Sequence, residues 1–243
     1  MDPRGKVAII TGGARIGQTV AAALAKRGCA LALVYRASRE AAEKTVASAK
    51  AAGVNAIAHQ ADARHEDQVE AAVKETVKSL GGLDILINMA STYLKTPNPT
   101  EADWTDAIDS NAKSAFLFST HAARIMKDRG AGRIINISDW LPIGGRPRYQ
   151  GYVPYYTSKA AVAALTEGLA LELAPEILVN AIAPGPILAP ADFTAEETAR
   201  VIEATPLRRW GGGEEIAKTV LFLIETEFVT GECIRVDGGR HLF

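Results

Sequence analysis

Tyr155 and Lys159 have the residue types and the spacing most suited to chemistry in this chain. On a helix, side chains four residues apart lie on the same face, so this tyrosine and lysine can act together. A free tyrosine has a pKa of about 10 and exchanges protons poorly at neutral pH, but a neighbouring ammonium group favours the phenolate. We therefore expect Tyr155 to move a proton, with Lys159 lowering its pKa. Tyr156 is the weaker candidate, because its partner four residues on is Ala160.

A second polar position follows the apolar run 132–137, where Ser138 and Asp139 stand side by side. Adjacent residues of a strand point to opposite sides, so only one of the two can face the same site as Tyr155. A serine would donate a hydrogen bond to a substrate carbonyl. A carboxyl group would instead hold an amino group or relay a proton. The residues alone leave both possibilities open.

A glycine-containing loop, Thr11-Gly12-Gly13-Ala14-Arg15-Ile16-Gly17, lies between an apolar run and a predicted helix. Glycine permits a tight turn and a close approach of the backbone to a pyrophosphate. The free N–H groups at the start of the helix would then face the anion. The spacing leaves open whether Gly13 or Ala14 faces the phosphates.

The cofactor preference is predicted from the end of the second apolar run, Tyr35-Arg36-Ala37-Ser38. Sites for NAD place an acidic residue about 20 residues beyond the glycine loop to bind the ribose 2′-hydroxyl. Here that acid is absent. The Arg36 guanidinium and the Ser38 hydroxyl suit a 2′-phosphate, which predicts NADPH.

Apolar runs alternate along the chain with longer runs rich in Ala, Glu and Lys. Most of the apolar runs are continuous, which is typical of parallel strands covered on both faces. We predict one doubly wound α/β domain over residues 1–243, with a central parallel sheet of about seven strands and helices on both faces. Its ligand would lie at the carboxyl ends of the strands. The expected strands are 6–11, 30–35, 54–59, 83–88, 132–137, 177–182 and 233–236. The expected helices are 18–27, 38–52, 65–80, 155–173, 194–204 and 213–224, with a further helical region at 100–129 in one piece or two.

Charge and composition argue against several other classes. The 27 basic and 28 acidic residues form no basic stripe, so we expect no nucleic-acid or anionic-membrane partner. No run approaches the roughly 18 apolar residues of a membrane span. Cys29 and Cys233 form neither a metal pattern nor a disulfide framework, and no metal site is expected. These features predict a cytoplasmic protein that acts on a small molecule.

Taken together, the glycine loop and the Tyr155–Lys159 pair resemble the short-chain dehydrogenase/reductase family, whose fold is Rossmann-like. The resemblance extends over nearly the whole chain. It implies that Asn111 completes the catalytic set by holding a water that links the lysine to solvent. It also implies a homotetramer and a substrate lid around 188–210. The implied cofactor contacts are Gly12, Arg15, Ile16, Gly17, Tyr35, Arg36, Ser38, Asp62, Ala63, Asn88, Ala90, Ser91, Tyr155, Lys159, Pro184, Gly185 and Ile187.

Within that family, the segments Arg15-Ile16-Gly17 and Ala90-Ser91, together with Asp139, look most like pteridine reductases. The resemblance implies NADPH-dependent reduction of a dihydropteridine, with Asn111, Asp139, Tyr155 and Lys159 as catalytic residues and Tyr155 as proton donor. The implied substrate contacts are Arg15, Tyr93, Asp139 and Trp140. The alternative within the family is reduction of a ketone such as a 3-oxoacyl thioester, with Ser138 as the carbonyl donor. A non-catalytic NADP-binding sensor is the alternative from another class.

Overall fold

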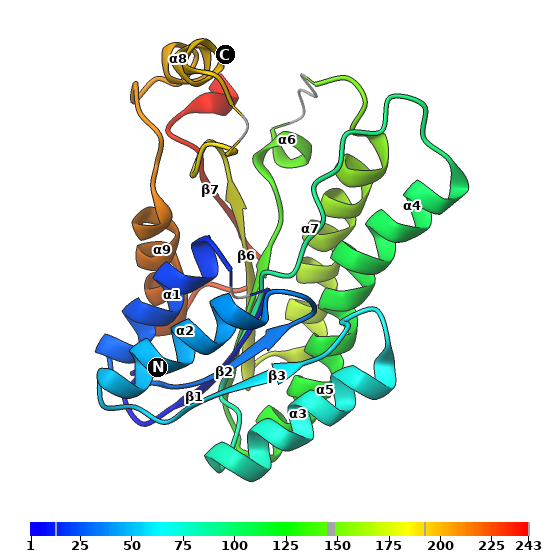
Figure 1. The fold of residues 1–243 in the computed structure, drawn as a ribbon. Coiled ribbons are helices and arrows are strands. Elements are labelled where there is room, and N and C mark those ends of the chain that lie inside the picture. Colours follow the sequence, from blue (N-terminus) through cyan, green and yellow to red (C-terminus); the bar gives the residue numbers. More distant parts are fainter. Residues whose placement is uncertain (13, 145–148, 192, 243) are drawn as a thin grey trace.

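The computed structural model describes residues 1–12, 14–144, 149–191 and 193–242. Within these residues, seven strands form one sheet in the order β3-β2-β1-β4-β5-β6-β7, and every pairing is parallel (Figure 1). The predicted α/β fold with a seven-stranded parallel sheet is therefore confirmed. The strands are β1 (Val7–Thr11), β2 (Ala30–Tyr35), β3 (Ala56–Gln60), β4 (Ile85–Asn88), β5 (Gly132–Ile137), β6 (Ile177–Pro184) and β7 (Cys233–Val236).

Strand β1 is the point where the strand order reverses, because it pairs with β2 on one side and β4 on the other. At its carboxyl end, Thr11 lies opposite Val34 of β2 and Asn88 of β4. The chain leaves the sheet in opposite directions from β1 and β4, which opens a crevice at this edge. The crevice is the place where a doubly wound sheet binds its ligand.

Helices cover both faces of the sheet (Figure 1). Helices α1, α2 and α9 lie on one face, and α3, α5 and α7 lie on the other, with α4 beside α7. This arrangement follows from right-handed crossovers between parallel strands. The helices are α1 (Ile16–Lys26), α2 (Arg39–Ala51), α3 (Glu66–Leu80), α4 (Glu101–Ala107), α5 (Ser114–Asp128), α6 (Trp140–Ile143), α7 (Val153–Leu173), α8 (Ala195–Glu203), α9 (Gly213–Glu225) and the final 3₁₀ turn η2 (Arg240–Leu242).

Each face of the sheet has its own buried apolar cluster. Leu24 of α1 and Val220 of α9 belong to the cluster on one face. Phe118 and Met126 of α5 belong to the cluster on the other face. All four side chains are fully buried, and burying such a side chain stabilises the fold by about 1.5–3 kcal/mol. The two clusters hold the sheet rigid, so its carboxyl edge is a firm platform for a site.

The helical region 100–129, expected in one piece or two, forms two α-helices joined by a turn whose type the sequence pattern does not show. A π-helical turn, η1 (Ile108–Lys113), joins α4 to α5. Such turns are rare and frequently occur at functional sites. This one carries Ser110 and Asn111, both of which are buried. A second difference is at Ser38, which lies just before α2 and not within it, and which makes no capping hydrogen bond through its side chain.

Candidate active site

The glycine loop is fastened to the neighbouring strands. Thr11 Oγ1 accepts hydrogen bonds from the backbone N–H groups of Met89 and Ala90, at 3.0 and 3.1 Å. Gly12 has a φ of +70°, and a Cβ at this position would lie 2.8 Å from Ala90 Cα. Only glycine fits so close to another backbone without strain. Gly13 lies outside the described residues, and Ala14 lines the cavity described next.

A cavity of about 250 Å³ opens at the crevice between β1 and β4. Its volume, its glycine-lined base and its polar lining fit the adenosine half of a dinucleotide. Ser110 adds an independent indication, because its buried Oγ has no hydrogen-bond partner among the described residues. The cavity is lined by Thr11, Gly12, Ala14, Val34, Tyr35, Arg36, Ala37, Ser38, Ala42, Ala61, Asp62, Ala63, Arg64, Met89, Ala90, Ser91, Thr92 and Ser110.

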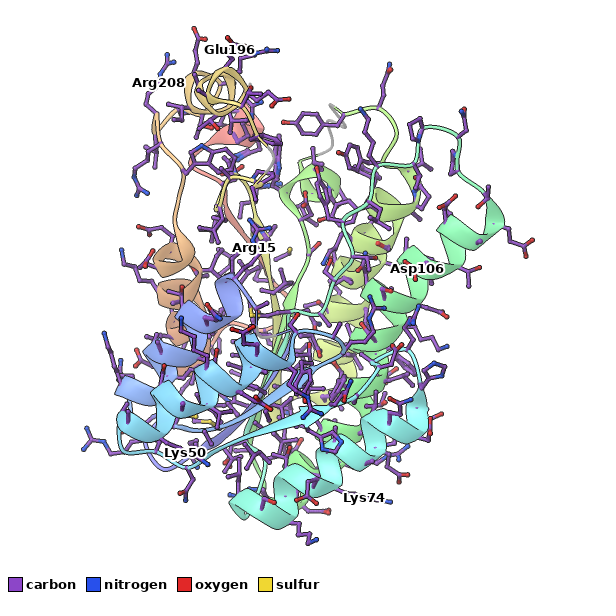
Figure 2. The ribbon with its side chains drawn as sticks, in the orientation of Figure 1. Arg15, Lys50, Lys74, Asp106, Glu196 and Arg208 are labelled. Atoms are coloured by element: carbon purple, nitrogen blue, oxygen red, sulfur yellow. The ribbon has the colours of Figure 1, made fainter. Side chains whose placement is uncertain are left out.

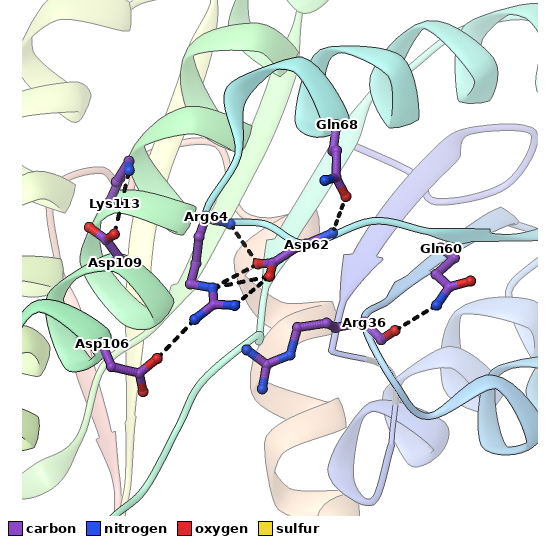
Figure 3. Close-up of polar contacts among 8 residues, drawn as sticks. All are labelled: Arg36, Gln60, Asp62, Arg64, Gln68, Asp106, Asp109 and Lys113. Atoms are coloured by element: carbon purple, nitrogen blue, oxygen red, sulfur yellow. Dashed lines mark hydrogen bonds and ion pairs between the residues drawn. The ribbon is translucent and has the colours of Figure 1, made fainter. Parts of the chain in front are cut away.

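One wall of this cavity is a charged cluster (Figure 3). Arg64 bonds the Asp62 carboxylate through Nε and Nη2, the latter at 2.6 Å, and it reaches Asp106 of α4 through Nη1 at 3.0 Å. The hydrogen bonds from Arg64 lower the pKa of Asp62 to about 2. Among the described residues, none accepts a hydrogen bond from the Arg36 guanidinium, which lies near this pair. Arg36 is therefore placed to meet an anionic group of a ligand.

Other predicted cofactor contacts lie along the same edge of the sheet. Ile16 and Gly17 begin α1, and a Cβ on Gly17 would lie 3.2 Å from the Gly12 carbonyl oxygen. Gly185 follows Pro184, and a Cβ there would lie 2.4 Å from Asp237 Cβ, so the loop leading to Ile187 also requires glycine.

Two predicted cofactor residues face elsewhere in the structure. Asn88 points into the core, where its Nδ2 donates to Asn136 Oδ1 at 2.8 Å and to Ser119 at 3.1 Å. Arg15 has a strained φ of +54° at the start of α1, and its Nη2 donates to the Ala189 carbonyl at 3.3 Å. Arg15 therefore links the glycine loop to the segment predicted as the lid (Figure 2).

Asp139, and not Ser138, lies beside Tyr155. The Tyr155 hydroxyl donates to Asp139 Oδ2 at 2.7 Å, while Asp139 Oδ1 accepts from the Leu141 N–H at 2.9 Å and caps α6. Ser138 is buried on the opposite side, where its hydroxyl donates to the Lys159 carbonyl at 2.8 Å. The choice left open by the residues is thus decided by the direction of the side chains at the end of β5.

The pKa of Tyr155 is raised in this structure, a net direction opposite to the one expected from Lys159 alone. The Lys159 ammonium donates to the Ile137 carbonyl at 2.7 Å and lies 6.0 Å from the centre of the Tyr155 ring. Burial, and then the neighbouring Asp139 carboxylate, hold the pKa of Tyr155 well above its ordinary value. Burial lowers the pKa of Lys159 to about 8 and raises the pKa of Asp139. The phenol form of Tyr155, which can give a proton, is therefore favoured.

Asn111 connects this group to the rest of the site. Its Oδ1 accepts from the Thr92 N–H at 2.8 Å, and its Nδ2 donates to the Thr92 carbonyl at 3.2 Å and to Ser158 Oγ at 2.8 Å. Ser158 belongs to α7, between Tyr155 and Lys159. Asn111 thus ties the loop after β4 to the helix that carries both residues.

Aromatic rings form one side of the entrance. Tyr93 stacks on Tyr152 with ring centres 5.0 Å apart, and it meets the Tyr155 ring edge-on at 4.7 Å. Tyr93 remains 54% exposed, so it is accessible to a ligand. Trp140 is buried directly after Asp139, and the Arg240 guanidinium lies 5.9 Å from its ring centre.

Sequence reasoning did not single out Arg64, Ser110, Tyr152, Ser158 or Arg240. Tyr152 had a detectable signal, because it stands at the start of the same helix as Tyr155. Ser110 is directly next to Asn111, which was a candidate. Arg64 stands two residues from Asp62, which was a candidate, but its second partner Asp106 is 42 residues away. Arg240 had no local signal, because Tyr149 and Ala204 are distant in sequence.

Within residues 1–12, 14–144, 149–191 and 193–242, none of the helices has the length and apolar character of a membrane span. The same residues contain no group of three or more His, Cys, Asp or Glu side chains arranged to hold a metal ion.

A doubly wound parallel sheet with a nucleotide-sized cavity at its reversal point and a Tyr–Lys pair beside it defines a dinucleotide-dependent oxidoreductase. Residues 13–241 match the family model described as enoyl-(acyl carrier protein) reductase. The chain belongs to the short-chain dehydrogenase/reductase family, and it is an NAD(P)-dependent oxidoreductase.

Three relatives show how activities vary around this chain. A 3-oxoacyl-[acyl-carrier-protein] reductase, FabG, of Staphylococcus aureus is 37% identical, with 98% of each chain covered. The NADPH-dependent 3-quinuclidinone reductase of Rhodotorula rubra has a TM-score of 0.91 at 28% identity, covering 100% of this chain and 93% of its own. An NAD⁺-bound xylitol dehydrogenase has a TM-score of 0.89 at 31% identity, covering 98% of this chain and 100% of its own. None of the three is a pteridine reductase.

Proposed function

We propose that this protein uses NADPH to reduce a carbonyl group of a small molecule, with Tyr155 as proton donor. The observation that carries the proposal is the Tyr155 hydroxyl, which is kept protonated by burial and by its 2.7 Å contact with Asp139. When bound, NADPH supplies a hydride to the carbonyl carbon. Tyr155 gives its proton to the carbonyl oxygen, and Lys159 keeps a positive charge nearby through its contact with Ile137.

The preference for NADPH is proposed from Arg36 and Ser38. A guanidinium beside the cavity that donates no hydrogen bond among the described residues suits the 2′-phosphate that distinguishes NADPH from NADH. An Arg36→Gln variant should bind NADPH about tenfold or more weakly while binding NADH almost unchanged, because it loses one charge-assisted hydrogen bond. Equal weakening of both cofactors would contradict this assignment.

A 3-oxoacyl thioester is the first substrate to test, and the Staphylococcus relative supports it. The similarity to FabG therefore favours the ketone alternative over the pterin prediction. The ketone would accept a hydrogen bond from Tyr155. Asp139 could donate a second hydrogen bond to the carbonyl oxygen only in its protonated form. Burial raises the pKa of Asp139, which favours that form.

A pterin remains the second candidate because of one specific observation. Asp139, which the resemblance to pteridine reductases assigns to the substrate, lies beside Tyr155, and a carboxylate there accepts hydrogen bonds from amino and ring N–H groups. Tyr93, which packs edge-on against Tyr155, would offer its exposed ring to a flat heterocycle. A pterin has both the N–H donors and the flat ring, whereas an acyl thioester group has neither.

The two candidates are separated by measuring NADPH oxidation with acetoacetyl thioester and with dihydrobiopterin, for the native protein and for Asp139→Ser. We expect turnover of the thioester to survive or increase in Asp139→Ser, because the variant regains a neutral donor. Turnover restricted to the pterin, and lost in Asp139→Ser, would reverse the order of the candidates. NADPH binding without turnover of any carbonyl or pterin would favour a non-catalytic sensor.

The proposal also includes the features that rest on the family resemblance. It treats residues 1–243 as one domain, with the segment 188–210 as a lid over the substrate, in a cytoplasmic homotetramer. The assembly is tested by light scattering on the purified protein, where a mass of one chain would contradict it.

A further inference from the structure

Helix α8 has no buried apolar face against the sheet, and contacts at its two ends hold it in place. None of its residues from Ala195 to Glu203 is buried. A helix without a buried face gains little from packing, so contacts outside it must fix its position. At its base, the rings of Phe193 and Trp210 meet edge-on with centres 6.4 Å apart. Figures 1 and 2 show α8, which carries Glu196, apart from the sheet and close to the carboxyl terminus, with Arg208 nearby.

Arg240 joins the end of this helix to the substrate side of the site. Its Nη1 donates to the carbonyl of Ala204, the residue that ends α8. Its Nη2 lies 3.4 Å from the Tyr149 hydroxyl, and its guanidinium lies over the Trp140 ring at 5.9 Å from the centre. Carbonyl groups at the end of a helix carry partial negative charge, so a guanidinium there is favourable.

The base from which Arg240 extends is rigid. The Asp237 carboxylate is 5% exposed and accepts hydrogen bonds from the N–H groups of Gly239 and His241 and from His241 Nδ1, at 2.9, 3.0 and 2.7 Å. A Cβ on Gly238 would lie 2.8 Å from Thr205 Cγ2, so this turn packs directly against the residue after Ala204. A rigid support allows one side chain to fix the position of a helix.

We propose that Arg240 is a positioning residue that holds α8 against Trp140 and Tyr149, and thereby sets the room for substrate above Asp139 and Tyr155. The inference rests on the proposed function, because it takes the substrate to lie over that pair. Trp140 directly follows Asp139, so any displacement of α8 relative to Trp140 alters the space next to the Asp139–Tyr155 hydrogen bond.

The test uses Arg240→Met, which keeps a long apolar side chain but loses the donors, and Arg240→Lys, which keeps the charge. In the cofactor-free protein, we expect faster hydrogen exchange of residues 195–204 in Arg240→Met. With substrate, we expect KM to rise about tenfold, the size of one lost charge-assisted hydrogen bond, while kcat changes less. The Kd for NADPH without substrate should stay the same, and Arg240→Lys should recover part of the loss.

Arg235→Met is the matched control for hydrogen exchange. Arg235 also donates to a carbonyl, that of Ile143 at 2.7 Å, but among the described residues it makes no hydrogen bond or ion pair with α8. Its variant should leave exchange of 195–204 unchanged. Unchanged exchange in Arg240→Met, equal acceleration in Arg235→Met, or an equal loss of NADPH affinity would each overturn the inference. Exchange needs no substrate, so the inference is tested even if the proposed reaction fails.

Discussion

The Tyr155 hydroxyl donates a 2.7 Å hydrogen bond to Asp139 Oδ2, so the proton that this tyrosine would deliver points at a carboxylate. A serine in the same place would bring no charge. The Asp139 charge opposes formation of the phenolate, and this adds to the effect of burial on the pKa of Tyr155. The Asp139–Tyr155 pair therefore affects both which substrate the site accepts and the pH range over which Tyr155 keeps its proton.

The first prediction concerns the pH profile of Asp139→Asn. Reduction needs the phenol form of Tyr155, so activity is present below the pKa of Tyr155 and is lost as pH rises through it. Removing the Asp139 charge lowers that pKa, while Lys159, Tyr93 and Tyr152 still surround the phenol. The upper limb of kcat/KM should move to lower pH by about one unit or more.

The control for this profile is Asp109→Asn. Asp109 pairs with Lys113 on η1 and has no contact with Tyr155. Asp109→Asn should leave the upper limb of the kcat/KM profile at the same pH as in the native enzyme. If the upper limb in Asp139→Asn stays at the native pH or moves to higher pH, the Asp139 charge does not raise the pKa of Tyr155.

The second prediction concerns Lys159→Met, which should abolish turnover and raise stability. Lys159 is 2% exposed, and burial lowers its pKa from 10.5 to about 8. For a base with a lowered folded-state pKa, the charged form costs stability below pH 8, and this cost disappears as pH approaches 10.5. At pH 7 we expect the free energy of unfolding to rise by roughly 1–3 kcal/mol.

Urea denaturation of Lys159→Met at several pH values checks this sign. The gain over the native protein should shrink between pH 8 and 10.5. Lys127→Met, at an exposed position of α5, should give no comparable gain. A destabilised Lys159→Met at pH 7 would show that the contact with Ile137 outweighs the cost of burial.

The third prediction concerns Gly12→Ala, which should weaken both the fold and the binding of NADPH. The new Cβ would lie 2.8 Å from Ala90 Cα at a φ of +70°, and the Ala90 backbone cannot move without disturbing β4. Gly53→Ala is the matched control, because its φ is +89° but nothing lies within 4 Å of a Cβ there. Gly53→Ala should cost about 1–2 kcal/mol of stability and leave the Kd for NADPH unchanged.

Fluorescence titration with NADPH separates the two glycine variants. Gly12→Ala should bind at least about tenfold more weakly, since a misplaced loop loses its contacts with the phosphates. Equal affinity in both variants would mean that the loop around Gly12 does not approach the cofactor.

The fourth prediction concerns Ser110→Ala, for which stability and binding should change in opposite directions. The Ser110 Oγ is buried without a partner in the described residues, so its removal should stabilise the cofactor-free protein by about 1 kcal/mol. Ser110 also lines the nucleotide cavity, so removal of its hydroxyl should weaken NADPH binding severalfold. The increase in Tm on adding NADPH should therefore be smaller than in the native protein.

Ser114→Ala supplies the contrast for this prediction. Ser114 Oγ already donates to the Ser110 carbonyl at 2.7 Å, so its loss should lower stability without altering NADPH binding. If Ser110→Ala lowers stability and leaves binding unchanged, the Ser110 hydroxyl is no part of the cofactor site.

Much of the fold could be predicted because its determinants are local. Strands 30–35, 132–137 and 233–236 were predicted with the bounds that the structure has. The first is a continuous apolar run, and the other two are short runs rich in Ile and Val, which favour strands. The π-helical turn η1 escaped prediction, because one altered turn leaves no separate period in the sequence. The start of α7 at Val153 was missed by two residues, although Pro154 is a residue favoured in a first turn.

The candidate site likewise has parts that a local sequence pattern predicts and parts that depend on tertiary packing. The sequence by itself determined the family, the Tyr155–Lys159 pair and the Gly12 loop, because each depends on residues that are close along the chain. Only the tertiary structure decided that Asp139 faces Tyr155 while Ser138 bonds the Lys159 carbonyl. That choice depends on how β5 and α7 are placed against one another.

The longest connections were also decided by tertiary structure alone. Arg64 reaches Asp106 from 42 residues away, and Arg240 lies beside Tyr149 from 91 residues away. Such pairs form because the crossovers bring the loops at the carboxyl ends of the strands to one edge of the sheet. A local pattern fixes which residues stand next to one another along a helix or strand, but the packing of the sheet and helices decides which distant side chains meet.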